Sequence, residues 1–364
     1  MSTSSLLSAT TRPIVIGIDT HKDIHVAVAL DHLGRRLAEL HVPTTVAGYM
    51  GLEQWATSLG TVEVFGIEGT GSYGAGISRY LRQRRHRLVE VNRPDRATRN
   101  RLGKSDPIDA EMAARLVLAG VASGTPKTGD GPVEMLRLLK LAKDSAVKTR
   151  TQSMNQIKAM IVTATTESRD TLTGLRNAQL IDRCAAFRPG RLTSGTAVAK
   201  YTLRLLAKRH LDLGLEIAAV ELEIERLVSV AAPALLNVFG LKADGAARLL
   251  VSAGDNPGRL RSEAAFAALC GSNPVPASSG KTQRHRLNRG GDRQANATLH
   301  RIVVVRLRWH PPTQAYMRRR LAEGKSKPEI MRCLKRYVAR EVFGMIRPPA
   351  AIQQVTADEA VRAA

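Results

Sequence analysis

The chain has 364 residues, which is long enough for about two or three domains and a substantial core. Its 55 lysines and arginines against 32 aspartates and glutamates give a net charge of +23, which predicts a polyanionic partner, most commonly the phosphate backbone of a nucleic acid. No stretch approaches about 18 uncharged apolar residues and no signal peptide opens the chain, so the sequence predicts neither a membrane-spanning helix nor secretion.

The N-terminal third of the chain alternates strand and helix patterns. Strands show apolar residues at every second position, and helices show them at steps of three and four. The predicted strands cover 14–18, 24–30, 62–68 and 88–91, and the predicted helices cover 48–58, the residues around 77–81 and the segment 109–117. A strand hairpin followed by strands that alternate with helices predicts a mixed α/β sheet with helices on its faces.

Four carboxylates lie at the ends of these elements, where a two-metal nuclease needs them. Asp19 ends the first apolar run, and Glu68 ends the strand over 62–68. Asp106 and Asp109 are three residues apart, so on a helix they share one face. Two divalent ions about 4 Å apart can clamp the attacking and leaving oxygens of a phosphodiester, and they require several carboxylate ligands. We call these four residues the acidic tetrad and expect them to bind Mg²⁺ or Mn²⁺.

Each of these acids also has a purely structural explanation. Acids at strand ends commonly form turns. Asp106 before Pro107 fits a helix N-cap with proline at the first helical position, and Asp109 then falls at the capping-box position. For any one acid alone the structural explanation is preferred. The combination of four acids in the order strand, strand, helix favours the metal site.

Residues 120–132 are rich in Gly, Thr, Ser and Pro and predict a linker, beyond which the pattern is mostly helical. A helix near 135–162 carries lysines such as Lys140 and Lys143, which either contact nucleic acid or form a solvated face. A later stretch has apolar residues at three- and four-residue steps. On length alone it fits an ordinary amphipathic core helix and an extended helical arm that dimerises as a coiled coil about equally well, and the arm is the more specific expectation. The residues of this seam are Leu203, Leu206, Leu213, Ile217, Val220, Ile224 and Leu227.

Positive charge is concentrated near the C-terminus. Residues 281–347 contain 18 lysines and arginines against 4 acids. The Gly- and Arg-rich segment 286–293 has the charge and the flexibility to follow a phosphate backbone. The expected nucleic-acid contacts are Lys281, Arg284, Arg286, Arg289 and Arg293.

The three cysteines, Cys184, Cys270 and Cys333, are far apart in the sequence and odd in number. They form neither a disulfide framework nor a cluster with metal-ligand spacing. We therefore expect a reducing, cytoplasmic location of bacterial type, with association with the nucleoid through the protein's positive charge.

Several blocks of the sequence resemble a known family. The segments Ile-Gly-Ile-Asp-Thr-His-Lys at 16–22, Gly-Ile-Glu-Gly-Thr-Gly at 66–71 and Lys-Ser-Asp-Pro-Ile-Asp-Ala at 104–110 resemble the three acidic blocks of the DEDD transposases of the IS110 (IS-one-ten) insertion-sequence family. Residues 270–281 and 288–293 resemble the second, transposase-specific domain of that family. The blocks keep their order over nearly the whole chain, which makes the resemblance specific.

The resemblance implies a DNA transposase or recombinase that excises and inserts its own mobile insertion sequence. It implies Mg²⁺ held by the acidic tetrad, a serine nucleophile from the C-terminal domain, guidance by a structured RNA that the element encodes, and a composite site assembled between protomers. A homo-oligomer, either a dimer or a tetramer, is therefore expected. The expected domains are a RuvC-like domain of ribonuclease H fold over 13–124, a helical coiled-coil spacer over 125–230, a mostly helical transposase domain over 231–347 and a tail over 348–364.

The resemblance also implies where the nucleophile lies. The serine–glycine element of the family falls at Ser279 and Gly280, although a shift by one residue to Ser278 fits as well. A serine hydroxyl needs activation, and the neighbouring cations can neutralise charge on a transferring phosphoryl group. Without the resemblance, the Pro- and Ser-rich segment 274–280 predicts simply a turn.

The residues alone leave two other functions open. A RuvC-like junction nuclease uses a metal-activated water and forms no covalent adduct between protein and DNA. A non-catalytic nucleic-acid binder uses the acids only as caps and turns, and its activity survives Asp19→Ala or Asp106→Ala. Charge and carboxylates do not separate these functions, and it is the family resemblance that favours recombination.

Overall fold

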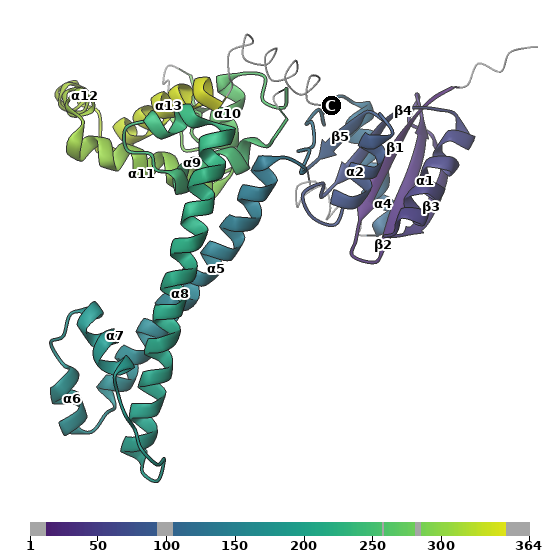
Figure 1. Ribbon diagram of the computed structural model, residues 1–364. Coiled ribbons are helices and arrows are strands. Elements are labelled where there is room, and N and C mark those ends of the chain that lie inside the picture. Colours follow the sequence, from purple (N-terminus) through teal and green to yellow (C-terminus); the bar gives the residue numbers. More distant parts are fainter. Residues whose placement is uncertain (1–11, 93–104, 257, 281–284, 347–364) are drawn as a thin grey trace, which may run out of the picture. The chain divides into compact units, whose positions relative to one another are not determined.

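The computed structural model describes residues 12–92, 105–256, 258–280 and 285–346, which form two compact units (Figure 1). The first unit extends to Gly131 and includes the segment Gly254–Arg259, and the second contains the remaining residues. The expected contacts Lys281 and Arg284 and the expected tail lie outside the described residues.

A mixed five-stranded sheet forms the centre of the first unit, in the order β3-β2-β1-β4-β5. β1 (Pro13–Thr20) pairs antiparallel with β2 (Ile24–Asp31) and parallel with β4 (Thr61–Glu68). β3 (Arg36–Pro43) and β5 (Leu88–Val91) are the two edge strands. The sequences of β1 and β2 are nearly continuous apolar runs because both faces of each strand are buried.

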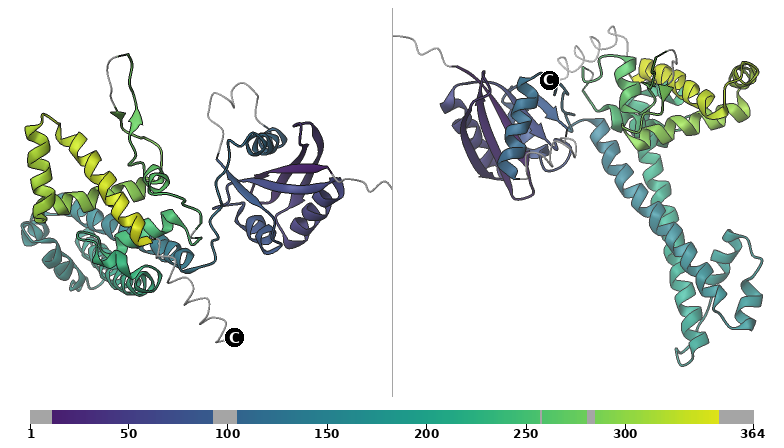
Figure 2. Two further views of the ribbon diagram at one scale, coloured as in Figure 1. Left: turned by 90° about the horizontal axis from the view of Figure 1, so that it is seen from above. Right: turned by 180° about the vertical axis from the view of Figure 1, so that it is seen from behind.

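Helices cover both faces of this sheet (Figures 1 and 2). α1 (Val46–Leu59) and α2 (Ala75–Gln83) pack on the face that carries Ile16 and its alternate neighbours, and α4 (Asp106–Leu118) packs on the opposite face over β1, β2 and β4. Side chains of a strand alternate between its two faces, so one apolar run supplies both layers. This is the arrangement expected of a RuvC-like, ribonuclease H-type domain, and the prediction of an α/β region followed by a helical region is confirmed.

The edge strand β3 was not predicted from the sequence. Its residues include the charged Arg36 and Glu39, and most of its positions are exposed or half-buried. Charged side chains on an edge strand discourage pairing with other chains, but they also weaken the alternating apolar signal. The helix predicted over 48–58 begins slightly earlier, at Val46, where the Thr45 hydroxyl accepts a hydrogen bond from the Gly48 amide at 3.2 Å.

Two long helices, α5 (Pro132–Val162) and α8 (Gly195–Ala231), run side by side in the second unit (Figures 1 and 2). The shorter helices α6 (Thr166–Leu172) and α7 (Asn177–Ala185) lie between them in sequence and pack at one end of the pair. The second unit thus spans most of the expected spacer and the expected C-terminal domain, while the three-part division itself stays a prediction.

The heptad seam of α8 packs within the chain, where four of its seven residues are buried and the other three are half-buried. Leu203 packs with α5 and α7 at one end of the helix pair, and Ile224 and Leu227 pack with the start of α5 at the other. His210, which fills the gap in the seam, places its ring Nδ1 3.2 Å from the Arg150 carbonyl oxygen of α5. The expectation that this seam joins two subunits is therefore wrong, because α5 of the same chain folds back along α8 and covers it.

Lys140 and Lys143 of α5 are buried in ion pairs. Their Nζ atoms lie 2.5 and 2.6 Å from Oδ1 of Asp244, in the first turn of α9 (Ala243–Ala253). Burial works against ionisation of this carboxyl, but the hydrogen bonds and charges of the two lysines outweigh it and lower the pKa of Asp244 to about 2. These two lysines therefore neither form a solvated face nor remain available to nucleic acid.

The C-terminal helices pack around one core with the neighbouring ends of α5 and α8. They are α9, α10 (Glu263–Leu269), α11 (Arg293–Trp309), α12 (Pro311–Ala322) and α13 (Lys327–Ile346), preceded by a short 3-10 helix over Pro233–Asn237. Between α10 and α11, β6 (Val275–Pro276) and β7 (His285–Arg286) form a small antiparallel hairpin.

Candidate functional site

β1 and β4 bring the first two members of the acidic tetrad side by side. The strands are parallel neighbours and pair Ile18 with Ile67, so the residues that follow, Asp19 and Glu68, end the strands at the same edge of the sheet. Paired positions on neighbouring strands face the same side, which here is the side that α4 covers. Both carboxylates are buried, with exposed fractions of 6% and 8%.

Two glycines let α4 approach the sheet closely. A Cβ atom on Gly17 would lie 2.0 Å from the Ala110 carbonyl oxygen, and one on Gly66 would lie 2.6 Å from a side chain of α4. The backbone of α4 therefore lies directly against β1, which no larger residue would permit. Because Ala110 immediately follows Asp109, this close approach carries the first turn of α4 to the edge where β1 ends.

The first turn of α4 supplies the other two acids. The helix begins at Asp106, and its N-cap residue is Ser105, which makes no side-chain capping bond. Asp106 is therefore not the N-cap residue that its position before Pro107 allows. Asp106 and Asp109 both lie at the positive end of the helix dipole, which favours negative charge at this end of the helix.

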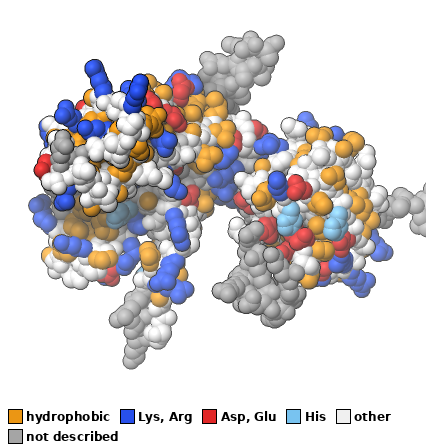
Figure 3. Space-filling view, turned by 90° about the horizontal axis from the view of Figure 1, so that it is seen from below, with side chains coloured by type: hydrophobic (Ala, Val, Ile, Leu, Met, Phe, Trp, Pro, Cys, Tyr) orange, Lys and Arg blue, Asp and Glu red, His pale blue; other side chains and the backbone are white. Residues whose placement is uncertain are grey.

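His21 links the strand end to the helix start. Its Nε2 atom lies 3.0 Å from Asp19 Oδ2 and 3.4 Å from Asp106 Oδ1. Ligand atoms of these three side chains all lie within 4.8 Å of one another, which is close enough to hold one metal ion. His21 was not among the predicted site residues, although it follows Asp19 by two residues in the Thr-His-Lys block. Figure 3 shows acidic and histidine side chains gathered on one face of the first unit.

The ionisation of Asp19 is influenced by its burial and by its charged neighbours. Burial raises the pKa of Asp19 above its usual value of 3.8; His21 opposes this rise, and the charges of Glu68 and Asp109 add to it. A divalent cation stabilises crowded carboxylates of this kind, and hard carboxylate oxygens are ligands that Mg²⁺ and Mn²⁺ favour. An open pocket of about 410 Å³, lined in part by His21, Asp106 and Tyr73, adjoins the cluster.

The predicted nucleophiles lie in the second unit. Ser278 and Ser279 are exposed and lie between β6 and β7, on the segment that joins the strands of the hairpin. Gly280 follows with φ +54, a left-handed conformation that glycine adopts without strain. The structure thus places both serines on an accessible turn, which matches the structural explanation of the segment and is also compatible with a nucleophile.

The two segments that resemble the transposase family, residues 270–281 and 288–293, pack closely together at the base of this hairpin. Gly271 and Gly291 lie back to back, because a Cβ on Gly271 would meet the Gly290 carbonyl oxygen and one on Gly291 would meet the Gly271 amide, each at 2.6 Å. Asp292 caps α11 by accepting hydrogen bonds from the backbone of its first turn, and it also accepts one from the Ser252 hydroxyl. These blocks therefore fix the base of the hairpin on α9 and α11.

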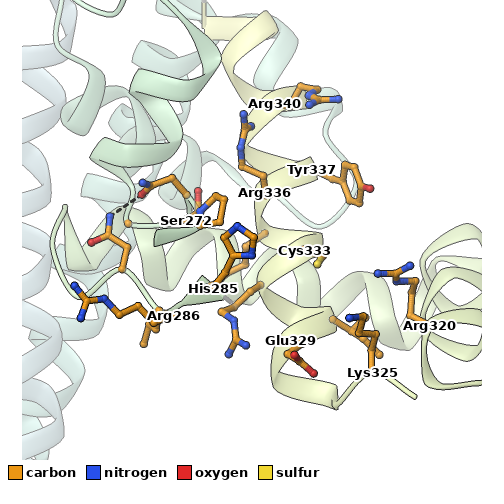
Figure 4. A pocket seen from close by; sticks show the side chains of 18 residues that line it. Ser272, His285, Arg286, Arg320, Lys325, Glu329, Cys333, Arg336, Tyr337 and Arg340 are labelled. Carbon is orange, nitrogen blue, oxygen red and sulfur yellow. Dashed lines mark hydrogen bonds between the residues drawn. The ribbon is translucent and has the colours of Figure 1, made fainter. Parts of the chain in front are cut away.

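A groove of about 750 Å³ lies between the base of the hairpin and α13 (Figure 4). Its cationic lining residues are Arg286, Arg320, Lys325, Arg332, Lys335, Arg336 and Arg340, and its acidic one is Glu329. Arg336 and Arg340 are partly neutralised, because each donates a hydrogen bond to Glu263, at 2.8 and 2.7 Å. Arg320 is also paired, with Glu323. The other cations, among them Arg286 and Arg332, make the groove a surface suited to phosphate groups.

Only one side of this groove was predicted from the sequence. Arg286 lines it, whereas Arg289 and Arg293 are exposed nearby and are not part of its lining. The contribution of α13 was missed, although the four-residue spacing of Arg332, Arg336 and Arg340 already indicated a basic helix face.

Comparison with protein families supports the resemblance. Residues 16–165 match a family model for the DEDD transposases of the IS110 group, described as "Transposase", and residues 232–318 match the "Transposase IS116/IS110/IS902 family". The two matches cover more than half of the chain and keep the order of the two regions. A comparison with curated proteins found no match. Among the described residues, every helix is too short or too polar to cross a lipid bilayer.

Proposed function

Because the chain belongs to the IS110 family of transposases, we propose that it excises and inserts a mobile DNA element by metal-dependent cleavage and joining of DNA strands. The observation that carries this proposal is the group formed by Asp19, His21 and Asp106, whose ligand atoms lie within 4.8 Å of one another at the end of β1. Glu68 ends the neighbouring strand β4 at the same edge of the sheet. Strands β1 and β4 and the first turn of α4 hold these side chains on rigid elements, which is what a centre for phosphoryl transfer requires.

We propose that the tetrad binds Mg²⁺ or Mn²⁺. When bound, such ions stabilise negative charge on the attacking and leaving oxygens of the phosphodiester. Asp19 and Glu68 are buried and fixed by their strands, so they set the position of the centre. His21 orients Asp19 and Asp106 by lying between their carboxylates, and the dipole of α4 favours the negative charge of its own two acids.

We propose Ser279 as the nucleophile, with Ser278 as the alternative. In the proposed step the serine Oγ forms a bond to phosphorus and the bond from phosphorus to the oxygen of the leaving strand breaks. The serine proton passes to a base or to solvent, and the leaving oxygen accepts a proton. Support for this role comes from the accessible turn that carries both serines and from the cationic groove at the base of the same hairpin.

Two partners complete the proposed function. DNA, as element ends and target, would bind along the cationic groove beside the hairpin, where Arg286 and α13 can contact phosphates. A structured RNA encoded by the element is proposed as the guide, on the basis of the family resemblance alone. Purification from cells that carry the DNA flanking the gene, followed by sequencing of bound RNA, tests this second partner. Recovery of only bulk cellular RNA would contradict the proposal of a guide RNA.

An excision assay on a donor plasmid with the element's own ends tests the proposed function. We expect Asp106→Asn and the double variant Ser278→Ala/Ser279→Ala each to abolish excision, while the exposed control substitutions Asp182→Asn and Ser145→Ala leave it unchanged. Excision that survives Asp106→Asn would indicate a non-catalytic binding protein. DNA cleavage that survives the double serine substitution would indicate a junction nuclease that uses a metal-activated water.

A further inference from the structure

Lys335, in the middle of α13, differs from the other buried cations that the structure describes. Among the described residues, four lysine and arginine side chains are buried, and three of them pair with a carboxylate. These three are Lys140, Lys143 and Arg306. Lys335 is only 7% exposed, yet within the described part of the chain its Nζ atom donates a hydrogen bond only to the neutral Oδ1 atom of Asn296, at 3.0 Å. The charge of this one buried cation is therefore not balanced by an acid of the described chain.

Burying an ammonium group without an opposite charge is unfavourable, because the group loses its hydration and gains no ion pair. Burial, together with the charge of Arg332 three residues earlier, lowers the pKa of Lys335 below its usual 10.5. The hydrogen bond to Asn296 does not account for a cation here, since a neutral glutamine also carries a donor for that bond. This bond uses one of the three donors of the ammonium group. The position therefore suits a site at which an anion from outside the chain supplies the missing charge.

The side chain of Lys335 is accessible to such an anion from the groove between the hairpin base and α13 (Figure 4). Arg286 of β7 and Arg332 of α13 also line this groove, so its positive potential disfavours a cationic occupant. A phosphate group carries its charge on oxygens that accept hydrogen bonds from ammonium and guanidinium groups. The chemistry of this part of the groove thus fits a phosphodiester.

Asn296 connects Lys335 to the hairpin that carries the candidate serines. It lies in the first turn of α11, and its Nδ2 atom donates hydrogen bonds to the carbonyl oxygens of Cys270 and Gly271, at 2.7 and 3.0 Å. These residues begin the segment that leads into β6. Because the oxygen of the same amide accepts the bond from Lys335, the ammonium group is held in a defined position relative to the base of the hairpin.

We propose that Lys335 binds one backbone phosphate of DNA in this groove and thereby sets the register of the DNA strand relative to the hairpin. This inference rests on the proposed function, which supplies DNA as the substrate. Exposed lysines and arginines attract a phosphate backbone without selecting one position along it. A buried cation fixed by Asn296 must instead meet one defined phosphate, and phosphate contacts of this kind fix the register of a protein on DNA.

A thermodynamic cycle between protein and DNA tests this contact. The probe is duplex DNA from the element's own end, and its affinity is measured by fluorescence anisotropy without divalent ions, so that no strand is cleaved. Neutral methylphosphonates replace the backbone phosphates one at a time. Lys335→Gln should weaken binding of unmodified DNA at least about 10-fold, because it removes a charge-assisted hydrogen bond. One particular methylphosphonate should weaken wild-type binding by a similar factor and have little effect on Lys335→Gln.

Lys327→Gln is the matched control, because Lys327 is an exposed lysine of the same helix that does not line the groove. It should bind DNA nearly as the wild type does and keep the wild-type sensitivity to every methylphosphonate. Lys335→Met removes the same charge with an unbranched side chain, and it replaces Lys335→Gln in the cycle if that variant does not fold.

Wild-type affinity in the Lys335 variant, or losses that simply add at every phosphate, would overturn the proposed contact. An effect confined to RNA binding would overturn the assignment to DNA. Because the cycle involves neither metal nor cleavage, its result is separate from the excision assay. Failure of excision would leave a coupled Lys335–phosphate contact standing, and an uncoupled Lys335 would leave the proposed excision standing.

Discussion

In the candidate metal centre, the fold holds carboxylates near one another although their negative charges repel. Burial, together with the charges of Glu68 and Asp109, raises the pKa of Asp19 above its usual value, and a bound divalent cation would favour the charged form of this carboxyl. We predict that Asp19→Asn lowers the affinity for Mn²⁺, measured by calorimetry, by at least about 10- to 100-fold. The exposed control Asp182→Asn should bind Mn²⁺ as the wild type does. Equal affinity in both variants would mean that Asp19 is not a ligand.

His25 is fully buried on β2, where it stacks on Tyr49 with ring centroids 5.8 Å apart, and among the described residues neither ring nitrogen has a hydrogen-bond partner. Burial, helped by the charge of His21, lowers the pKa of His25 below its usual 6.5. The unfolded chain therefore binds a proton below pH 6.5 that the folded chain does not. This histidine thus costs no stability above pH 6.5 and increasingly destabilises the fold as the pH falls below it.

We therefore predict that His25→Phe, which keeps the aromatic stack, reduces the loss of melting temperature between pH 7.5 and about pH 5.5. The exposed His32→Phe serves as the control and should show the wild-type pH dependence. If His25→Phe and the wild type lose the same melting temperature on acidification, His25 does not make the fold acid-sensitive.

The residue types and order of the acidic tetrad could be predicted from the sequence, because an acid that ends an apolar strand or opens a helix is visible in the pattern. The role of His21 could not, because its significance depends on its distance to Asp106, far along the chain. The burial of Lys140 and Lys143 also could not be predicted from the sequence. Their burial against Asp244 depends on how α9 packs on α5, which no spacing within α5 reveals.

At the scale of elements, the contact of α4 with β1 positions half of the tetrad. Gly17→Ala would place a methyl group 2.0 Å from the Ala110 carbonyl oxygen, so α4 must shift. We predict a loss of about 2–3 kcal/mol in the free energy of unfolding, together with weaker Mn²⁺ binding. Gly51→Ala on α1 meets no atom within 4 Å, and as a helical glycine it should gain up to about 1 kcal/mol. Unchanged stability in Gly17→Ala would show that α4 does not rest on β1.

The hairpin and the start of α11 should supply phosphate contacts. Each contact made by lysine or arginine adds about 0.9 to the slope of log affinity against log salt on duplex DNA. We predict that replacing Arg286, Arg289 and Arg293 by alanine lowers this slope by up to about three. A matched control replaces the exposed arginines 176, 188 and 191, which removes the same charge and should change the slope little. Equal slopes in the two triple variants would mean that the hairpin arginines face solvent.

The long helix α8 shows what periodicity can and cannot determine. The seam from Leu203 to Leu227 correctly predicted a long helix that packs against another helix. The identity of the partner could not follow, because a stripe pairs equally well with α5 of the same chain or with a second copy. Only the packing of the folded chain shows that α5 covers the seam.

At the scale of the whole molecule, the proposed chemistry is divided between the two units. The acidic tetrad belongs to the first unit and the candidate serines belong to the second. Neither unit alone carries all the groups that the proposed strand cleavage requires. Fold class and family could be predicted from ordered sequence blocks, whereas spacing along one chain does not encode how the tetrad and the candidate serines would be brought together.

The measurement that tests the central claim most directly is the trapping of a covalent linkage between protein and DNA. A substrate that blocks rejoining of the cleaved strand is incubated with the protein and Mg²⁺, and the DNA-modified peptide is then mapped by mass spectrometry. The proposed mechanism predicts an adduct on Ser279, or on its neighbour Ser278, that requires the divalent ion and disappears in Asp106→Asn. Strand cleavage without an adduct on either serine would contradict the mechanism.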